Sequence, residues 1–503
     1  MKQNIDILRK AYEEVIESLK TDKDKRYFEE IFSSLLKIIL ETEKNPDIIY
    51  KAVIDDYMSE IKKISVLTPG ISTCLRDEKY DITLNTYINK LSDIPKDKDI
   101  EENTVFDSSS MTKMFTSILL LKEEEKGNID LRKNFSYYLK DMPSIDVKII
   151  DALKFKSEIR TDGRIDEDNI TKKQIIKRIR NSYVYKYDTF KYSDVPYMLI
   201  PLIYSALYDS QEKYMQIFYE LYSSLDLNQT GYYKKNITGG IVDIDLKSEK
   251  ETYIKNGPYD PKARILEKNG LISAHAGLAT NITDLEKLFS HMCNNLLSQS
   301  QLTELITPSY STLEKLRENN SICIINGKET KVDKAMGVFI NTGKLGISKV
   351  GPFYSKTSFA SQGSAGTYAV FDIENKLMSS IMSNIKSTTH SKYIMYQGKY
   401  YTQIGGTHSP KDGSLFNPFM TFGEATNNLK EESYKTLIKL RITKIFLTKI
   451  IELKKDEESL KRKEILKSTF NQKVIIKNNT VYFKKIKWYN EPEGSEVIWK
   501  NET

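Results

Sequence analysis

Residues 106–131 read Phe-Asp-Ser-Ser-Ser-Met-Thr-Lys-Met-Phe-Thr-Ser-Ile-Leu-Leu-Leu-Lys-Glu-Glu-Glu-Lys-Gly-Asn-Ile-Asp-Leu and are the most informative stretch of the chain. They place Ser110 and Lys113 one turn apart at the start of an apolar-faced helix, where such side chains are neighbours. A lysine amine there can accept the proton of a serine hydroxyl, which is otherwise a weak nucleophile. We expect this helix to end near Gly127, because glycine is a typical C-terminal cap.

The spacing of Ser110 and Lys113 is not specific in a lysine-rich chain. What distinguishes Ser110 is its context, with an extended Phe106 before it and a strongly apolar helix through Leu121 after it. The start of a helix also favours negative charge and offers free backbone amides. A serine-rich helix cap would have the same sequence, so both readings stay open at this point. The same spacing recurs at Ser34–Lys37, Ser59–Lys62 and Ser210–Lys213.

Composition limits the class of protein. With 503 residues the chain is long enough for two or three units. Its 76 basic and 69 acidic residues interleave, so the net charge of +7 gives little support to nucleic-acid binding. Abundant Lys, Ile, Asn and Tyr are typical of an AT-rich bacterial genome. No apolar run approaches the length of a signal peptide or a membrane span, so we expect neither.

The numbers and spacing of the cysteines and histidines favour a reducing compartment and do not indicate a metal site. The three cysteines, Cys74, Cys293 and Cys323, are far apart and odd in number, which favours reduced thiols in a cytoplasmic protein. The four histidines show no metal-ligand spacing with one another or with the cysteines. We therefore expect no metal site and no cofactor.

The order of elements predicts an α+β fold, in which an antiparallel sheet is flanked by helices and interrupted by an all-helical insert. We expect an N-terminal helical segment at 1–63, a central domain at 64–395 and a C-terminal extension at 396–503. The residue patterns behind this division are helices at 1–63 and 430–463, a strand hairpin at 71–84, helices and loops at 147–292, short strands at 336–340, 367–373 and 378–383, an irregular stretch at 396–430 and a small hairpin at 473–500.

Tyr192-Ser193-Asp194 precedes the apolar run 195–203 and carries a second candidate group. Tyr192 and Asp194, two residues apart on a turn before a helix, can face one cleft. An ammonium nearby, such as that of Lys113, favours the phenolate form of a tyrosine. Most of the 32 tyrosines must be packing residues, however, and Asp194 has the alternative role of a helix N-cap.

Phe359-Ala-Ser-Gln-Gly-Ser-Ala-Gly-Thr367 leads into a β run and is the third candidate segment. Small residues on a strand edge let a substrate backbone approach, and their amides can bind an oxyanion. Taken alone, the segment is better explained by a glycine-containing bulge or turn.

Together and in this order, these segments resemble the serine β-lactamase and penicillin-binding-protein superfamily, nearest its class C β-lactamase and esterase-like branch. The likeness runs from about Pro69 to Asn384. Residues 103–116 are similar to the nucleophile segment, Tyr192-Ser-Asp to the Tyr-x-Asn motif, and 359–367 to the third motif. Asp260-Pro-Lys-Ala-Arg264 and His275-Ala-Gly-Leu are similar to a stretch common in the esterase-like members.

The resemblance implies an acyl-enzyme mechanism in which Ser110 attacks a carbonyl while Lys113 and Tyr192 relay its proton. It also implies that the amides of Ser110 and Ser364 form the oxyanion hole. The remaining residues of the substrate site would be Asp194, Ser361, Gln362 and Gly363.

Two departures from the family pattern change what is expected. Asp194 replaces the usual Asn, and its negative charge would hold Lys113 protonated. Ser361 stands where the family has a Lys or His, the cation that helps the proton relay and binds a substrate carboxylate. Lys356 and Arg264 are the candidates to replace it in space. These changes argue against efficient hydrolysis of β-lactam antibiotics.

The leading hypothesis is therefore a cytoplasmic serine hydrolase that acts on an ester or amide, such as a small acylated peptide or metabolite. The alternatives are a degenerate member that binds a ligand without turnover, and a nucleic-acid-associated protein that uses the basic tail at 473–487. His275 is expected to be structural rather than catalytic, since no Asp-His-Ser geometry follows from the sequence.

Overall fold

The computed structural model divides the chain into two compact units, described separately below. The first comprises residues 1–100, 376–379 and 391–503, and the second comprises residues 101–375 and 380–390. The residues that the structure describes are 2–18, 25–26, 28–29, 32, 46–65, 70–89, 100–167, 169–210, 212–233, 244–245, 253–254, 257–343, 350–383, 393–396, 399–402, 422–454, 466, 470–477, 480–483 and 497–500.

The first unit contains a sheet with helices packed beside it. β1 (Gly70–Asp77) and β2 (Ile82–Asn89) form an antiparallel hairpin. β18 (Asn471–Lys477) runs parallel to β2 and antiparallel to β19 (Thr480–Phe483), which pairs in turn with β20 (Val497–Lys500). The predicted N-terminal hairpin is confirmed, while the C-terminal strands extend the same sheet.

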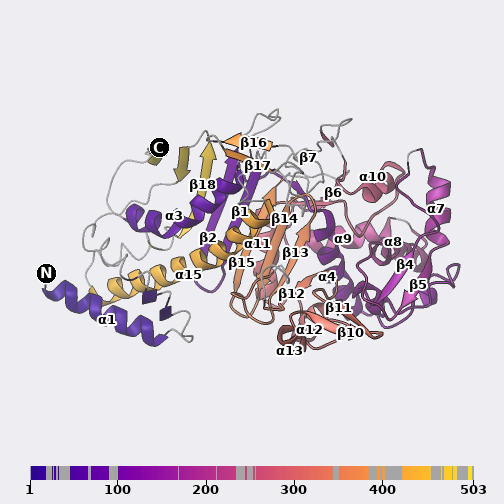
Figure 1. Ribbon diagram of the computed structural model, residues 1–503, viewed down its shortest axis with the longest axis horizontal. Coiled ribbons are helices and arrows are strands. Elements are labelled where there is room, and N and C mark those ends of the chain that lie inside the picture. Colours follow the sequence, from indigo (N-terminus) through magenta and orange to yellow (C-terminus); the bar gives the residue numbers. More distant parts are fainter. Residues whose placement is uncertain are drawn as a thin grey trace. The chain divides into compact units, whose positions relative to one another are not determined.

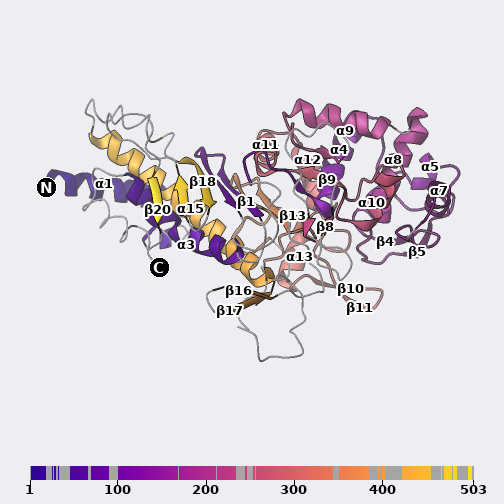
Figure 2. The ribbon, with the colours of Figure 1, turned by 90° about the horizontal axis from the view of Figure 1, so that it is seen from above.

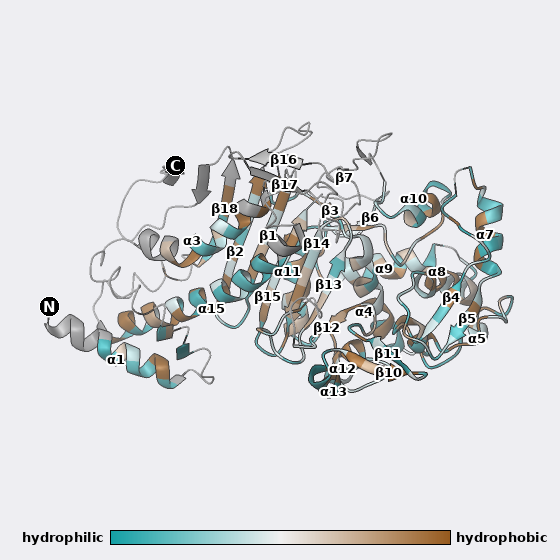
Figure 3. Cartoon of the chain, in the orientation of Figure 1, coloured by the Kyte–Doolittle hydropathy of each residue, from teal (hydrophilic) through white to brown (hydrophobic). Residues whose placement is uncertain are grey.

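Helices α1 (Lys2–Ser18), α3 (Pro46–Ser65) and α15 (Phe422–Lys454) belong to the first unit. Figures 1 and 2 both show α15 lying along α3, and the two helices make extensive contact. Figure 3 shows hydrophobic and hydrophilic residues mixed along α15. The helix begins earlier than the predicted residue 430. The second N-terminal helix, predicted around residues 28–39, lies mostly outside the described residues.

The stretch expected to be irregular contains a strand. β16 (Tyr393–Tyr396) and β17 (Lys399–Thr402) pair antiparallel. Tyr, Ile and Thr favour strands, and this preference prevails over the turn-forming residues that follow. The prediction of irregular structure from residue 396 is therefore wrong at β17, and residues 403–421 lie outside the described part of the chain.

The second unit contains the edge strands β12 (Phe339–Ile340), β13 (Phe359–Gly363) and β14 (Thr367–Asp372), paired antiparallel in that order. β15 (Leu377–Ser383) has residues in both units. β3 (Phe106–Asp107), β9 (Leu278–Thr280) and β6 (Gly231–Tyr232) form a separate antiparallel sheet in the order β3-β9-β6. The predicted α+β architecture with a mainly antiparallel sheet is confirmed.

The helix predicted at Ser110 begins with a tighter turn than the sequence indicates. Ser109–Met111 form a 3₁₀ turn, which continues directly into α4 (Thr112–Glu125). Residues 111–121 of this helix are all buried, so α4 is a central helix rather than a surface one. α4 ends two residues before Gly127, which adopts φ +75°, as the sequence predicts.

The insert is mainly helical but is not wholly so. β4 (Ser157–Arg160) and β5 (Tyr183–Tyr187) pair antiparallel within it. Alternating tyrosines at 183, 185 and 187 carry the strand signal, which the charged neighbours obscure. The helices of this unit are α5 (Phe135–Tyr138), α6 (Ile149–Leu153), α7 (Lys172–Arg180), α8 (Val195–Tyr208), α9 (Lys213–Ser224), α10 (Pro261–Lys268), α11 (Ile282–Cys293), α12 (Gln299–Ile306) and α13 (Leu313–Glu318).

Two short hairpins complete the second unit, β7 (Ile244–Asp245) with β8 (Tyr253–Ile254) and β10 (Ile322–Ile325) with β11 (Lys328–Lys331). Cys74, Cys293 and Cys323 are all free thiols. Within the described residues, none of the helices has both the length and the apolar character needed to cross a membrane.

Candidate active site

The turn that carries Ser110 is held by a buried aspartate. Asp107 accepts hydrogen bonds from the backbone amide of Ser109 at 2.6 Å, from the Ser109 hydroxyl at 2.8 Å and from the Tyr233 hydroxyl at 2.8 Å. Ser109 has φ +44°, a left-handed conformation that costs a non-glycine residue free energy. Burial raises the pKa of Asp107 despite these hydrogen bonds. Asp107 thus stabilises the strained residue that immediately precedes Ser110.

The structure brings Ser110, Lys113 and Tyr192 together. The Lys113 ammonium donates to Ser110 Oγ at 3.2 Å, and the Tyr192 hydroxyl donates to the same oxygen at 2.9 Å. Lys113 also donates to the backbone carbonyl of His275 at 3.0 Å, and its side chain is 1% exposed. Lys113 of α4 and Tyr192, three residues before α8, thus both donate hydrogen bonds to the Ser110 hydroxyl oxygen.

Asp194 gives Lys113 a carboxylate partner. Its Oδ1 lies 2.9 Å from Lys113 Nζ, and its Oδ2 lies 3.0 Å from Lys262 Nζ. Burial is the largest single influence on the pKa of Lys113 and would lower it, but the combined attraction to Asp194 and Tyr192 holds this pKa above its usual range. Burial would raise the pKa of Asp194, yet Lys113 chiefly holds it well below its usual range. The structure therefore favours a charged Lys113, in the direction that the sequence predicts.

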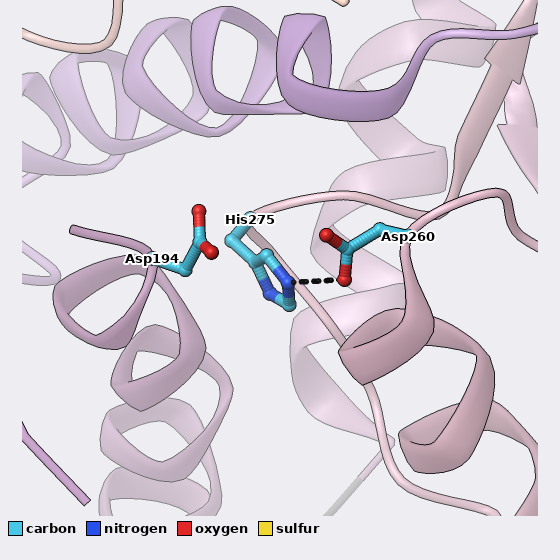
Figure 4. Close-up of side chains that lie close together, drawn as sticks. All are labelled: Asp194, Asp260 and His275. Atoms are coloured by element: carbon cyan, nitrogen blue, oxygen red, sulfur yellow. Dashed lines mark hydrogen bonds and ion pairs between the residues drawn. The ribbon is translucent and has the colours of Figure 1, made fainter. Parts of the chain in front are cut away.

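His275 forms a second set of hydrogen bonds next to Asp194. His275 is fully buried; its Nδ1 lies 2.8 Å from Ser273 Oγ, and its Nε2 lies 3.1 Å from Asp260 Oδ1. Figure 4 shows Asp260 and Asp194 on opposite sides of the imidazole, at the starts of α10 and α8. Ser273 is itself only 4% exposed. These hydrogen bonds hold in place the loop that contains the His275 carbonyl, which accepts from Lys113. The side chain of His275 therefore supports the site without contacting Ser110.

Asp194, Asp260 and His275 also have ligand atoms that lie within 4.8 Å of one another, close enough for a metal ion. However, Asp194 already pairs with Lys113 and Lys262, and a metal cation would have to face both ammonium groups. The donor set does not fit a metal site, and we interpret it as an ion-pair network.

The third candidate segment, residues 359–367, lies against the turn that carries Ser110. A β-carbon at Gly363 would overlap the backbone carbonyl oxygen of Ser108 and the Thr367 hydroxyl, so only glycine allows β13 to approach this closely. Thr367 Oγ1 donates to the same carbonyl at 3.4 Å. Ser364 makes a side-chain hydrogen bond with Tyr259.

Ser361 lies two residues before Gly363 in β13, so the two residues share one face of the strand. Its side chain is 1% exposed, and its hydroxyl has no hydrogen-bond partner among the described residues. Gln362, on the opposite face, is partly buried, and its carbonyl oxygen likewise has no partner there. Ser361, which the resemblance aligns with the family's cation, thus has an unsatisfied hydroxyl among the described residues.

Neither Arg264 nor Lys356, the two replacements suggested by the sequence, supplies a cation at Ser361. Arg264 donates to the backbone carbonyls of Pro258 at 2.9 Å and Tyr259 at 3.3 Å, and Lys356 is exposed in the turn before β13. The structure instead brings Lys334 to Tyr192, with Nζ 5.6 Å from the ring centroid. Sequence reasoning missed Lys334 because no motif marks it, and it missed the role of Lys262 for the same reason.

Two cavities lined by described residues of this unit bear on the site. One, of about 420 Å³, is lined by Tyr192, Asp194 and Lys262 together with Arg160 of β4 and Arg164 of the β4–α7 connection. The other, of about 490 Å³, is mainly apolar and lies among α8, α9 and α10, with Ser273 in its wall. The smaller cavity therefore opens beside the candidate tyrosine.

A mainly antiparallel sheet with a helical insert, and with a Ser-Lys pair facing a Tyr from the insert, defines the β-lactamase-like class of folds. The chain belongs to the Beta-lactamase family, whose family model matches residues 69–397. A search of curated proteins finds no match.

Solved structures with a similar fold include the following three. "EstCE1, a hydrolase with promiscuous acyltransferase activity" is 11% identical with a TM-score of 0.49, covering 77% of this chain and 100% of that one. FmtA from Staphylococcus aureus is 16% identical with a TM-score of 0.47, covering 67% and 84%. The D-amino acid amidase from Ochrobactrum anthropi SV3 is 14% identical with a TM-score of 0.45, covering 67% and 90%.

Proposed function

We propose that the protein is a serine hydrolase that cleaves an ester or amide through an acyl-enzyme on Ser110. One observation carries the proposal: the Ser110 hydroxyl lies within hydrogen-bond distance of both the Lys113 ammonium and the Tyr192 hydroxyl. A serine with two such partners can lose its proton as it attacks. Convergence of the three groups also argues against the alternative of a degenerate member that only binds a ligand.

The reaction would proceed in two balanced steps. In molecules whose Lys113 is a free amine, Ser110 Oγ forms a bond to the carbonyl carbon while its proton passes by way of the Tyr192 hydroxyl to Lys113 Nζ. Lys113 becomes an ammonium, and the electrons of the carbonyl double bond move to the oxygen, which takes the negative charge. The amides of Ser110 and Ser364 are the proposed donors to that oxygen. The leaving alkoxide or amine then departs with the proton, and water repeats the sequence to release the acid and restore Ser110.

The substrate is proposed to be a small acylated peptide or metabolite. Ser361 supplies no positive charge where the family's cation would bind a carboxylate, so the proposal excludes efficient hydrolysis of β-lactam antibiotics. Asp194, Gln362 and Gly363 remain the proposed lining of the substrate site. Free thiols at Cys74, Cys293 and Cys323 are consistent with a reducing compartment, and we propose a cytoplasmic location.

Hydrolysis of p-nitrophenyl acetate tests the proposal. The wild-type protein should release p-nitrophenol, and Ser110→Ala should lower the rate by at least roughly 10³-fold because no nucleophile remains. Ser210→Ala is the matched control, since Ser210 and Lys213 repeat the spacing of Ser110 and Lys113. Equal rates for the wild type and Ser110→Ala would contradict the proposal.

Asp194→Asn should move the activity profile toward lower pH. Asp194 raises the pKa of Lys113, so its charge keeps the amine protonated and unable to accept a proton at neutral pH. Removing the carboxylate lowers that pKa, and the rising limb of kcat/KM against pH should shift to lower pH, with about tenfold more activity at pH 7.

Asp166→Asn is the control for Asp194→Asn. Asp166 lines the same 420 Å³ cavity and pairs with Arg164, at 3.1 Å. This variant should leave the pH profile in place. A rising limb that stays fixed, or moves to higher pH, in Asp194→Asn would show that Lys113 is not the group whose proton limits the reaction.

A further inference from the structure

Lys334 lies on a tight turn packed against the candidate catalytic helix. Within the turn, Ala335 donates to the Val338 carbonyl at 3.0 Å, and Ile340 donates to the Asp333 carbonyl at 3.0 Å. Gly337 has φ +71°, and a β-carbon there would come within 2.9 Å of the Lys113 carbonyl oxygen. Ala335, Val338 and Ile340 are buried, so the turn is fixed against α4 at Lys113 itself.

The side chain of Lys334 is directed toward Tyr192. Its ammonium lies 5.6 Å from the centroid of the Tyr192 ring and 4.4 Å from that of Phe339, while Asp333 Oδ1 anchors it at 2.7 Å. The side chain is only 18% exposed. A cation within about 6 Å of an aromatic centroid is attracted to the ring, more strongly where water is excluded. Lys334 is therefore held in place by a carboxylate and two rings.

Tyr192 thus has two ammonium groups over its ring, since Lys113 lies 5.0 Å from the same centroid. The two cations differ in their partners: Lys113 contacts Ser110 and pairs with Asp194, whereas Lys334 pairs with Asp333. Lys334 approaches from the turn before β12, the strand next to β13. Ser361, the residue that stands where the family has its cation, lies on that neighbouring strand.

We propose that Lys334 is a positioning residue that orients Tyr192 and stabilises negative charge on its phenol during acylation of Ser110, in place of the cation missing at Ser361. This inference rests on the proposed function. Lys334 neither accepts nor donates the transferred proton. As the serine proton moves, the charge that develops on the Tyr192–Ser110 pair lies beside two cations instead of one.

The experiment measures the rate at which a fluorophosphonate labels Ser110 and the kcat and KM for p-nitrophenyl acetate. Lys334→Met should lower both the labelling rate and kcat roughly tenfold, because it removes a positive charge beside the Tyr192 phenol. KM should change little, because Lys334 does not contact the substrate in this proposal. Lys334→Arg keeps the charge and stacks well on aromatic rings, so it should retain most of the activity.

Lys331→Met is the matched control. Lys331 also pairs with Asp333, at 3.4 Å, but it is half exposed and is not among the cations over the Tyr192 ring. This variant removes the same charge from the same carboxylate and should react like the wild type. A loss equal to that of Lys334→Met would assign the effect to Asp333 and overturn the proposal.

A double-mutant cycle separates action through Tyr192 from a purely structural role. In a Tyr192→Phe background, which keeps the ring but removes the hydroxyl, Lys334→Met should change the labelling rate less than about twofold. A full tenfold effect in that background, or an inactive Lys334→Arg, would overturn the proposal. Absence of any Ser110 labelling in the wild type would instead refute the proposed function, and this inference with it.

Discussion

Replacing Lys113 with methionine should lower the rate of Ser110 acylation by roughly 10³-fold, the size expected when a general base is removed. The variant removes the ammonium that lies 3.2 Å from Ser110 Oγ and leaves only the Tyr192 hydroxyl on that oxygen. It should also reduce the free energy of unfolding by about 3 kcal/mol, because the buried carboxylate of Asp194 loses one of its two cations. Labelling by a fluorophosphonate and urea unfolding measure the two effects.

The double variant Lys113→Met, Asp194→Asn is the control that separates these effects. It removes both charges of the buried pair and should recover most of the lost stability, since replacing both partners of a buried ion pair costs less than removing one. Acylation should remain slow, because the proton acceptor is still absent. Recovery of the labelling rate together with stability would mean that Lys113 only maintains the fold.

Alanine at Gly363 should reduce acylation by roughly 10²-fold, the loss typical of one misplaced oxyanion donor. A β-carbon at this position overlaps the Ser108 carbonyl and the Thr367 hydroxyl, so β13 must move away from the turn that carries Ser110. The Ser364 amide, one residue further on, would move with it. The same overpacking should lower the free energy of unfolding by about 1–3 kcal/mol.

Gly127→Ala serves as the comparison for Gly363→Ala. Unlike Gly363, Gly127 has a glycine-favouring φ of +75°, and a β-carbon there would meet nothing within 4 Å. This variant should be destabilised by backbone strain alone, with kcat/KM unchanged. If both variants lose activity in proportion to stability, the close approach of β13 to Ser108 has no special role at the site.

The parts of the fold that local sequence controls were predictable. The apolar run after Ser110 and the glycine at 127 define α4, and the alternation at 71–84 defines the β1–β2 hairpin, because periodicity and caps act over a few residues. The β4–β5 hairpin was missed because its exposed tyrosines alternate with charged residues. The 3₁₀ turn at Ser110 depends on hydrogen bonds that Asp107 accepts and on β9, which both lie outside the helical pattern.

The candidate site was predictable only where the chain carries a motif. Ser110, Lys113 and Tyr192 could be named in advance, and their side chains converge. Lys334 and Lys262 could not, because their contacts join segments 142 and 68 residues apart in the sequence and depend on packing alone. The catalytic roles of Ser361, Gln362, Gly363 and Ser364 remain predictions.

The central claim is that Ser110 is the nucleophile of the site. Mass spectrometry of the intact protein after exposure to a fluorophosphonate, followed by peptide mapping, tests it most directly. The account predicts one adduct per chain on the peptide that contains Ser110, absent in Ser110→Ala and retained in Ser210→Ala. An unmodified wild-type protein, or an adduct that persists in Ser110→Ala, would contradict it.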